Sequence, residues 1–562
     1  MAPIKKTVKT VLILLLGFSL SRCANQLPPP GGEVDKTPPS IVELNPKDGT
    51  VNFKGNSIDI TFSEYVNRRS VQDNIFISPK INGELDYSWS GRSLEITFPD
   101  SLKKNTTYSI TVGAGAADLN NNNRMAEAFS FSFSTGSTID SCKIAGKVYD
   151  KDPAGILIFA YKGKGDEINI AKAQPDYVSQ VGRNGNYILK GLGYGNYSVF
   201  AIRDKMGDYV YDEGVDYIGM PFENVDLKRD SSSYEGLDFF LSVKDTIVPH
   251  ISKVVMTDRN HIALEFSKAV DSTLIKPGNF YLIDSLTRKK TEMKYFYKGQ
   301  GKPFQFFLSF ADSINKSGSL FLTAENITDL NGNKLASETA SVVYNPRADT
   351  STAKIIKLTG QYQGDLLDYE TPQIYVQFDH AFPVSAPAEG ISVTEGKDKV
   401  LKINTEPVDN SSFRINVTDK VKPKSELTVN IDLSKFKDVA GKGADSLYKK
   451  NFQVINDLDF SGTMGTVEAD SVKDIYVVLE KSEGEKRAYR QKTDGKGNFE
   501  IKKVVPGKYL LWSFRDSDRN KAYSYGKLKP FTYSEKFKFY ADTLNLRARW
   551  PVGDIKIQLD KK

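Results

Sequence analysis

The stretch Ser57-Ile58-Asp59-Ile60-Thr61-Phe62 alternates polar and apolar residues and leads into Ser63-Glu64. Alternation with period two is typical of a β-strand that buries one face and exposes the other to water. The pattern returns along the chain, as in Ser130-Phe131-Ser132-Phe133-Ser134, whereas no long segment after the first 23 residues has helical periodicity. The 28 Tyr and 32 Phe residues, against 3 Trp, also favour strands. The sequence therefore predicts an all-β protein.

The strand that ends at Phe62 belongs to a segment that occurs three times. The first copy runs from Asp35-Lys36-Thr37-Pro38-Pro39 to the turn Asp118-Leu119-Asn120. The second copy contains Asp245-Thr246-Ile247-Val248-Pro249, Leu264-Glu265-Phe266-Ser267-Lys268 and Asp329-Leu330-Asn331-Gly332-Asn333. A more diverged third copy contains Tyr375-Val376-Gln377-Phe378-Asp379 and Asp438-Val439-Ala440-Gly441-Lys442. Self-similarity at this length indicates tandem modules.

These three segments resemble the bacterial Ig-like domains of surface and S-layer proteins. The resemblance rests on the leading Asp and Pro residues, on the strand end in Phe-Ser and on the late Asp-Leu-Asn turn. It covers roughly 300 residues and implies three β-sandwiches. In physical terms, the prolines stiffen the linker before the first edge strand, and the turn residues tolerate a positive φ.

A second kind of segment occurs twice, at a constant offset. The matched pairs are Asn184-Gly185-Asn186-Tyr187 with Lys496-Gly497-Asn498-Phe499, Gly195-Asn196-Tyr197 with Gly507-Lys508-Tyr509, and Arg203-Asp204 with Arg515-Asp516. Each copy follows a strand that begins with Gly, at Gly146-Lys147-Val148 and Gly462-Thr463-Met464. These motifs resemble the carboxypeptidase-regulatory-like module, a transthyretin-type sandwich. The resemblance implies two Greek-key β-sandwiches.

The repeats divide the chain into a tandem array. We expect a signal peptide at 1–22, a lipidated tether at 23–39, and then five modules. Module 1 (40–140), module 3 (244–346) and module 4 (347–455) are Ig-like, and module 2 (141–243) and module 5 (456–562) are carboxypeptidase-regulatory-like.

The start of the chain resembles a lipoprotein signal. Basic residues precede an apolar run from Val11 to Leu20, which is too short to span a bilayer as a helix. Leu20-Ser21-Arg22-Cys23 resembles a lipobox, with Arg22 where a small residue is usual. The resemblance implies that Cys23 carries lipid, and acyl chains hold a protein stably to a membrane. The Pro- and Gly-rich residues 24–39 then form an extended tether.

Charge and cysteine content narrow the function further. The whole chain is +6, from 76 basic and 70 acidic residues, and four of the basic residues lie in the predicted signal. The near balance of charge argues against a nucleic-acid partner, which needs a net basic face. After Cys23 the other cysteine is Cys142, so we expect no internal disulfide and a small apolar role for Cys142.

The three histidines do not form a recognisable catalytic or metal motif. His261 and Glu265 have the spacing that binds zinc on a helix, but four residues along a strand span about 13 Å. His250 follows a linker proline and His380 stands at a strand end, so we expect structural or exposed roles. Because no nucleophile elbow or phosphate-binding loop is present either, we expect no catalytic residue.

One acidic loop is a candidate for calcium. Asp516, Asp518 and Asn520 place oxygen atoms at positions 1, 3 and 5, as in a calcium loop, although Lys521 and Lys527 replace the Gly and Glu of an EF-hand. The alternative is a solvated loop whose carboxylates accept hydrogen bonds from turn amides. Apart from this calcium possibility, we expect no cofactor.

These features favour a non-enzymatic scaffold of the cell envelope that contacts the membrane through its lipid and another envelope protein through its modules. The alternative is a glycan- or peptide-binding lipoprotein of an outer-membrane uptake system, which would need an exposed aromatic patch. The candidates for such a patch are Trp89, Trp512 and Trp550, and we expect Trp512 to be buried. The absence of Asp after Cys23 favours the outer membrane, and the lack of acidic residues in 24–32 favours its periplasmic face.

Overall fold

The computed structural model describes residues 34–81, 83–99, 101–243, 247–298, 304–383, 388–438, 441–484 and 486–560. Strands and loops make up almost all of this part, in which α2 (Arg68–Gln72) is the one α-helix. The prediction of an all-β chain is therefore confirmed. The chain divides into two compact units, Met1–Tyr211 with Ile218–Leu241, and Asp212–Tyr217 with Ser242–Lys562. Cys23 lies outside the described residues, so its lipidation stays a prediction.

Module 1 is a sandwich of two antiparallel sheets. One sheet has the order β1 (Ile41–Asn45), β2 (Ser57–Phe62), β5 (Ser93–Thr97), β4 (Asp86–Ser90), and the other has the order β3 (Ile75–Ser78), β6 (Thr107–Val112), β7 (Phe129–Ser134). Asn67 caps α2 by accepting a hydrogen bond from the Ser70 amide at 3.1 Å, which begins the short helix between the two sheets.

Module 2 also has two sheets. The first has the order β10 (Tyr177–Gln180), β9 (Leu157–Lys162), β12 (Gly195–Arg203), β13 (Tyr217–Gly219), with β14 (Val225–Leu227) also paired to β12. The second has the order β11 (Asn186–Leu192), β8 (Cys142–Tyr149), β15 (Ser233–Glu235), with β16 (Phe239–Phe240) also paired to β8. Strand β15 runs parallel to β8, unlike the pairs of module 1.

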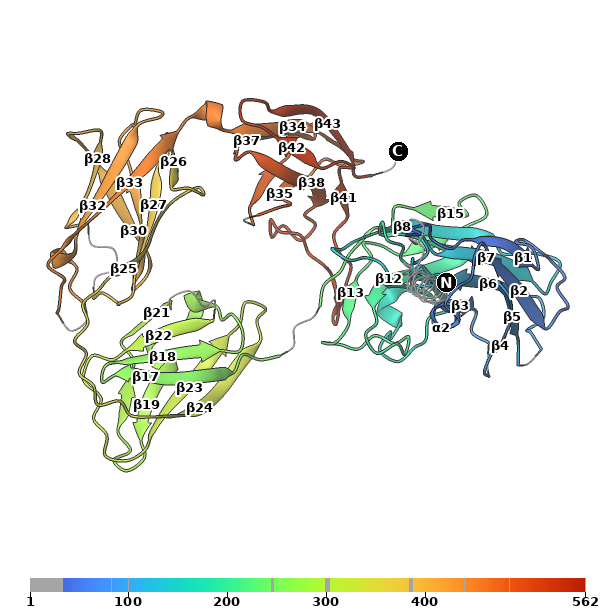
Figure 1. Ribbon diagram of the computed structural model, residues 1–562, viewed down its shortest axis with the longest axis horizontal. Helices are drawn as coiled ribbons and strands as arrows, with labels where there is room; N and C mark the ends of the chain where they lie inside the picture. Colours follow the sequence, from blue (N-terminus) through green and yellow to red (C-terminus); the bar gives the residue numbers. More distant parts are fainter. Residues whose placement is uncertain are drawn as a thin grey trace, which may run out of the picture. The chain divides into compact units, whose positions relative to one another are not determined.

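Module 3 repeats the strand order of module 1. One sheet is β17 (Ile251–Asp258), β18 (His261–Phe266), β22 (Gln305–Ser309), β21 (Tyr295–Lys298), and the other is β20 (Lys290–Glu292), β19 (Phe280–Asp284), β23 (Leu320–Thr328), β24 (Lys334–Val342). Both sheets are visible in Figure 1. Apart from the extra short strand β20, the order is that of module 1.

Module 4 follows the same plan. One sheet is β25 (Ile355–Gly360), β27 (Gln373–Phe378), β31 (Ser412–Val417), β30 (Ile403–Asp409). The other is β26 (Leu366–Asp368), β33 (Leu447–Ile455), β32 (Glu426–Asp432), β28 (Ile391–Glu395), β29 (Lys399–Leu401). The three segments that share sequence motifs thus share a topology.

Module 5 matches module 2. Its sheets are β37 (Asn498–Val504), β34 (Ser461–Glu468), β43 (Val552–Gln558), and β36 (Ala488–Lys492), β35 (Ile475–Lys481), β38 (Gly507–Arg515), β41 (Phe537–Phe539), with β42 (Leu544–Leu546) also paired to β38. A hairpin of β39 (Lys527–Leu528) and β40 (Phe531–Thr532) is added. Strand β43 runs parallel to β34, as β15 does to β8.

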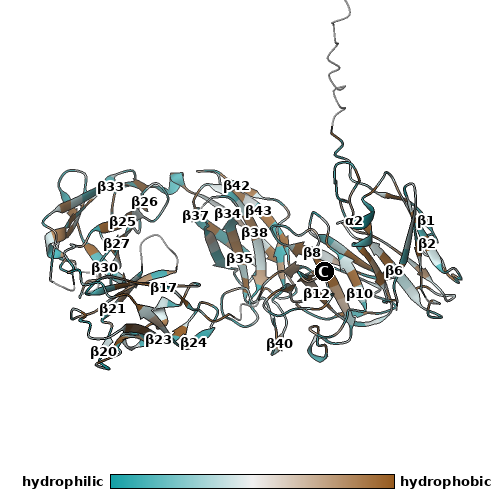
Figure 2. Cartoon of the chain, turned by 60° about the horizontal axis from the view of Figure 1, so that its bottom comes forward, coloured by the Kyte–Doolittle hydropathy of each residue, from teal (hydrophilic) through white to brown (hydrophobic). Residues whose placement is uncertain are grey.

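Buried apolar side chains of the described residues form five clusters, one for each of the five pairs of sheets. The hydrophobic residues follow the strands, as the brown bands in Figure 2 show. In β2 the buried residues are Ile58, Ile60 and Phe62, which are the apolar positions of the alternating sequence. Each module therefore has its own core, as expected when apolar residues recur every second position.

The expectation of one wet face is wrong for β7. Phe131 and Phe133 point into the core of module 1, but Ser130, Ser132 and Ser134 on the other face are also buried, with exposures of 5%, 6% and 1%. Strands β10 and β11 of module 2 contact β3, β6 and β7 on that face. Serine is small enough to let a second sandwich approach closely. The alternation in β7 therefore separates a Phe face, which packs in the core of module 1, from a Ser face, which packs against module 2.

Candidate functional site

Modules 1, 3 and 4 share a site, here called the corner site, where the second strand ends. It consists of the Asp of the leading motif, the residue two positions after the strand-ending Phe, and the Asp of the late turn. The amide that follows the Phe donates to the residue just before the first strand in each module, from Ser63 to Ser40 at 2.8 Å, from Ser267 to His250 at 2.8 Å, and from Asp379 to Lys354 at 3.1 Å. The backbone arrangement is therefore the same in all three modules.

The side chains at the corner site differ between modules. In module 1 it holds Asp35, Glu64 and Asp118, whose carboxylates lie within 4.8 Å of one another. In module 3 Lys268 replaces the glutamate, and its Nζ lies 2.9 Å from Asp329 Oδ2 and donates to the carbonyl of Ile247 at 2.6 Å. The leading Asp245 of module 3 lies outside the described residues.

In module 4 the corner site holds a histidine. Ligand atoms of Asp349, His380 and Asp438 lie within 4.8 Å of one another. Burial alone would lower the pKa of His380, but its hydrogen bond to Asp379 and the nearby charges of Asp379, Asp349 and Asp438 raise that pKa above its usual value. Lys442 Nζ lies 3.6 Å from Asp349 Oδ2 and donates to the Asp349 backbone carbonyl.

Module 3 adds a second histidine to this cluster. Asp258 and His261 stand on either side of the β17–β18 turn, and their ligand atoms lie within 4.8 Å of one another and of Asp349. The rings of His261 and His380 cross at 79° with centroids 5.9 Å apart. The linker between the modules is tied to the same turn, because the Arg259 amide donates to the Arg347 carbonyl at 3.0 Å.

Sequence reasoning missed this cluster. It compared His261 with Glu265 on the same strand, whereas the side chains around His261 are Asp258 across the turn, Asp349 of the linker and His380 of module 4. The His261–Glu265 pair was rejected because four residues along a strand span about 13 Å. That distance does not limit contacts between His261 and residues of other segments. Aligning the three repeats would have placed Asp349, His380 and Asp438 in register with Asp35, Glu64 and Asp118. That register is the signal in the sequence.

The predicted calcium loop is held together by its own hydrogen bonds. Asp516 accepts from the amides of Asn520 and Lys521 at 3.0 Å each, and Asp518 Oδ2 accepts from Ser524 Oγ at 2.6 Å. A third carboxylate, Glu535, lies within 4.8 Å of Asp516 and Asp518. Asn520 instead donates its side-chain amide to Asp518 at 2.9 Å. This arrangement has the features of the alternative, in which the carboxylates accept from turn amides, and calcium binding stays a prediction.

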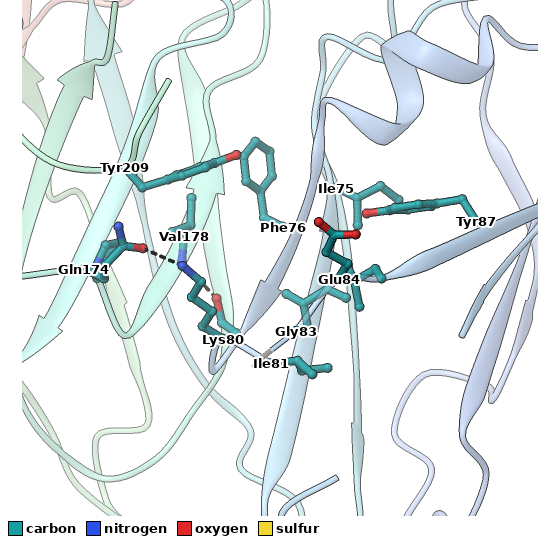
Figure 3. A pocket seen from close by; sticks show the side chains of 14 residues that line it. Ile75, Phe76, Lys80, Ile81, Gly83, Glu84, Tyr87, Gln174, Val178 and Tyr209 are labelled. Carbon is teal, nitrogen blue, oxygen red and sulfur yellow. Dashed lines mark hydrogen bonds between the residues drawn. The ribbon is translucent and has the colours of Figure 1, made fainter. Parts of the chain in front are cut away.

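A pocket of about 470 Å³ lies between modules 1 and 2 (Figure 3). Its lining is mostly apolar, and Lys80 of module 1 donates to Gln174 of module 2 at 3.2 Å. The rings of Phe76 and Tyr209 meet edge to face with centroids 6.1 Å apart, and Tyr87 lies on the opposite side. Burial raises the pKa of both Tyr87 and Tyr209 above the usual value. Such a lining, apolar with few polar groups, is typical of a small-molecule or peptide site.

The remaining predicted residues have simpler surroundings. Cys142 is 2% exposed, in agreement with the expected apolar role. Trp512 is 6% exposed, as expected, and stacks on Phe539 with centroids 5.8 Å apart. Trp89 is half-buried and stacks on Phe62, whereas Trp550 is 73% exposed. The three tryptophans belong to different sheets or modules, so among the described residues they do not form one aromatic patch.

Residues 35–135 match the model of a bacterial Ig-like domain. The match falls on module 1 and confirms that part of the resemblance drawn from its motifs. No curated protein matches the chain. Modules 3 and 4 share the main strand order of module 1, with β20 added in module 3 and β26 and β29 added in module 4.

Several solved structures show distant likeness. The N-terminal part of the bacterial S-layer protein SbsC is 13% identical over 37% of this chain and 44% of that one, with a TM-score of 0.17. Domains 1–6 of SbsC are 12% identical over 90% and 66%, with a TM-score of 0.16. BcpA, the major pilin subunit of Bacillus cereus, is 10% identical over 75% and 100%, with a TM-score of 0.13. The chain thus spans less than half of the first structure, and these scores carry no argument about function.

In the part of the chain that the structure describes, no helix has the length and apolar character needed to cross a bilayer.

Proposed function

We propose that this chain is a non-enzymatic scaffold of the cell envelope, anchored in the outer membrane by lipid on Cys23, whose modules present a fixed surface to another envelope protein. The proposal is supported by the signal-like residues 1–22 and by the way neighbouring modules within each unit are joined. A scaffold needs modules that keep their relative geometry, since flexible strings of domains do not present a composite surface.

The strongest support for the scaffold proposal is the junction of modules 1 and 2. Gln180 donates its side-chain amide to Asn74 at 2.9 Å and accepts from the Gly115 amide at 3.1 Å. Gly191 of β11 lies so close to module 1 that an added Cβ would stand 2.6 Å from Ser132 Oγ. The two sandwiches therefore pack closely through a hydrogen-bonded face, and both belong to the first compact unit.

The junction of modules 4 and 5 is built differently, from charge. Lys503 of module 5 donates to both oxygens of Asp368 at 3.1 and 3.2 Å and also pairs with Glu370. Tyr369 donates to Asp457 at 2.9 Å. Ion pairs that converge on one lysine from a neighbouring module restrict rotation about the linker, which supports a scaffold role for the second unit as well.

Anchoring is tested by Cys23→Ser. We expect this variant to move from the membrane to the soluble fraction, because the acyl chains are lost. Cys142→Ser is the matched control, since Cys142 is buried in module 2, and it should remain on the membrane. Membrane retention of Cys23→Ser would refute the lipid anchor.

Partner binding is tested by affinity purification from detergent-solubilised membranes followed by mass spectrometry. We expect one or a few envelope proteins to co-purify with the native chain and to be lost with Gly191→Val, which wedges modules 1 and 2 apart. Gly207→Val is the matched control, because Gly207 has a similar positive φ of 75° but no atom within 4 Å of an added Cβ. A native chain that purifies alone would argue against the scaffold.

The pocket between modules 1 and 2 favours a second candidate, a glycan- or peptide-binding role. Its aromatic side chains Tyr87 and Tyr209 face a cavity large enough for a few sugar rings or residues. Binding on glycan and peptide arrays, lost in Tyr209→Ala and retained in Tyr194→Ala, would support this role. Tyr194 is a suitable control because it is 53% exposed and does not line the pocket.

A further inference from the structure

We infer that the junction of modules 3 and 4 binds one divalent transition-metal ion of the zinc class, held by the imidazoles of His261 and His380 and by the carboxylate of Asp349. The ligands come from the β17–β18 turn of module 3, the linker and the strand end of module 4. The inference goes beyond the scaffold function and does not depend on the lipid anchor.

Both imidazoles are buried and oriented by a carboxylate. Each histidine is 8% exposed. His261 Nδ1 lies 2.9 Å from Asp258 Oδ1, and His380 Nδ1 lies 2.6 Å from Asp379 Oδ1. A histidine that donates from Nδ1 to a carboxylate presents Nε2 to a metal, and this second layer of hydrogen bonds is typical of metal-binding histidines. Nε2 of His261 is thus an expected ligand atom. Nε2 of His380 lies 2.8 Å from Ser351 Oγ, and a metal ion bound by His380 would take the place of this contact.

His261 is buried for a reason that only the junction explains. In β18 the core-facing residues are Ile262, Leu264 and Phe266, so His261 stands on the outward face of its own sandwich. A polar side chain on that face is normally exposed. Its burial shows that the linker and module 4 cover it and bring it towards the corner site.

Asp349 supplies the observation that points to a ligand. Its side chain is 5% exposed, and its Oδ2 is buried with no hydrogen-bond partner among the described residues. The ammonium ion of Lys442 lies 3.6 Å from this oxygen, beyond hydrogen-bond distance. Asp349 belongs to both histidine clusters, so its carboxylate lies close to both imidazoles. A buried carboxylate oxygen without a donor is costly unless a cation binds it.

The charge balance agrees with a cation. Four carboxylates, Asp258, Asp349, Asp379 and Asp438, surround the two imidazoles. Lys442 places one ammonium ion at this site. A divalent ion would offset much of the remaining negative charge in a buried setting where carboxylate repulsion is strong.

The donor set favours zinc-class ions over calcium and magnesium. Imidazole nitrogen with one or two carboxylates binds zinc, copper, nickel or cobalt, whereas calcium and magnesium prefer oxygen ligands alone. The all-oxygen clusters at Asp35, Glu64 and Asp118 and at Asp516, Asp518 and Glu535 lack such a nitrogen donor. Because the ligands come from two modules and the linker, the ion would also fix the junction.

Zinc binding to the purified full chain tests the inference. The chain is stripped with EDTA, dialysed and titrated with zinc sulfate against a chromogenic chelator, and the bound ion is counted by elemental mass spectrometry. We expect one ion per chain, with affinity lowered at least about 100-fold in His261→Gln and in His380→Gln. His250→Gln is the matched control, because His250 is exposed on module 3 and outside the cluster, and its affinity should be unchanged.

A second readout guards against variants that fail for other reasons. Circular dichroism should show that each variant keeps its β content. Hydrogen exchange should then show that zinc protects residues 347–354 and the β17–β18 turn in the native chain but not in Asp349→Asn. Failure of the native chain to bind zinc, equal binding by folded His380→Gln, or protection confined to other modules would each overturn the inference.

Discussion

Modules 1 and 3 both bury an aspartate at the corner site, but the side chains next to it have opposite charge. Both bury the Asp of the late turn, with Asp118 at 1% and Asp329 at 2% exposure, and both tie it to turn amides. Module 3 then places Lys268 beside its Asp, whereas module 1 places Glu64 there, close to its leading Asp35. One side chain thus decides whether the corner site contains an internal cation or three carboxylates.

The pKa values reflect this difference. Burial would raise the pKa of Asp329, but hydrogen bonds from Lys268, Asn333 and Asn331 lower it to about 2. In module 1, burial and the charges of Asp35 and Asp118 raise the pKa of Glu64. A shared backbone site is therefore not a shared function. In module 4 the same position holds His380, which is neither a lysine, as in module 3, nor a carboxylate, as in module 1.

The largest effect is expected from breaking the ion pair of module 3. Lys268→Met leaves Asp329 buried without its ammonium partner, which should lower the free energy of unfolding of module 3 by about 3 kcal/mol. Denaturant-dependent hydrogen exchange measures the change, in β18 and β23 for this variant and in β34 and β37 for the control in module 5. Lys502→Met is the control, because its pair with Glu500 is exposed at 72% and 49%, and it should cost less than about 0.5 kcal/mol. Equal effects of the two variants would show that the buried pair is not special.

Acid should weaken module 3 through the same aspartate. The folded pKa of Asp329 is about 2, below the unfolded value, so its stabilising contribution is complete above about pH 5 and is lost as the pH falls towards 2. The contribution is about 2 kcal/mol. Comparing acid unfolding of the native chain with Asp329→Asn isolates it, because the variant lacks this group but keeps the other carboxylates. Parallel acid-unfolding curves would contradict the assignment.

Local pattern predicted the strands, the repeats and the separate cores, because each follows from periodicity within a few residues. It failed where modules meet. Ser132 occupies a position that alternation predicts to be exposed to solvent, and the approach of β11 buries it. His261 likewise occupies an outward position of β18, and its partners Asp349 and His380 lie about a hundred residues later in the chain. Contacts between modules depend on linker geometry, which no periodicity encodes.

The smallest effect is expected from placing the lysine of module 3 at the corresponding position of module 1. Glu64→Lys places an ammonium ion beside Asp118 and should raise the free energy of unfolding of module 1 by about 1 kcal/mol at pH 7. The raised pKa of Glu64 means that its carboxylate form is disfavoured on folding, so native module 1 carries a penalty that grows as the pH rises through the unfolded and folded pKa values. The lysine removes that penalty and adds an attraction. In a double-mutant cycle, Asp118→Asn should abolish the gain. If Glu64→Lys instead destabilises module 1 while Lys268→Met destabilises module 3, the two corner sites differ in more than this one side chain, and the position of Asp35 is the first place to look for the difference.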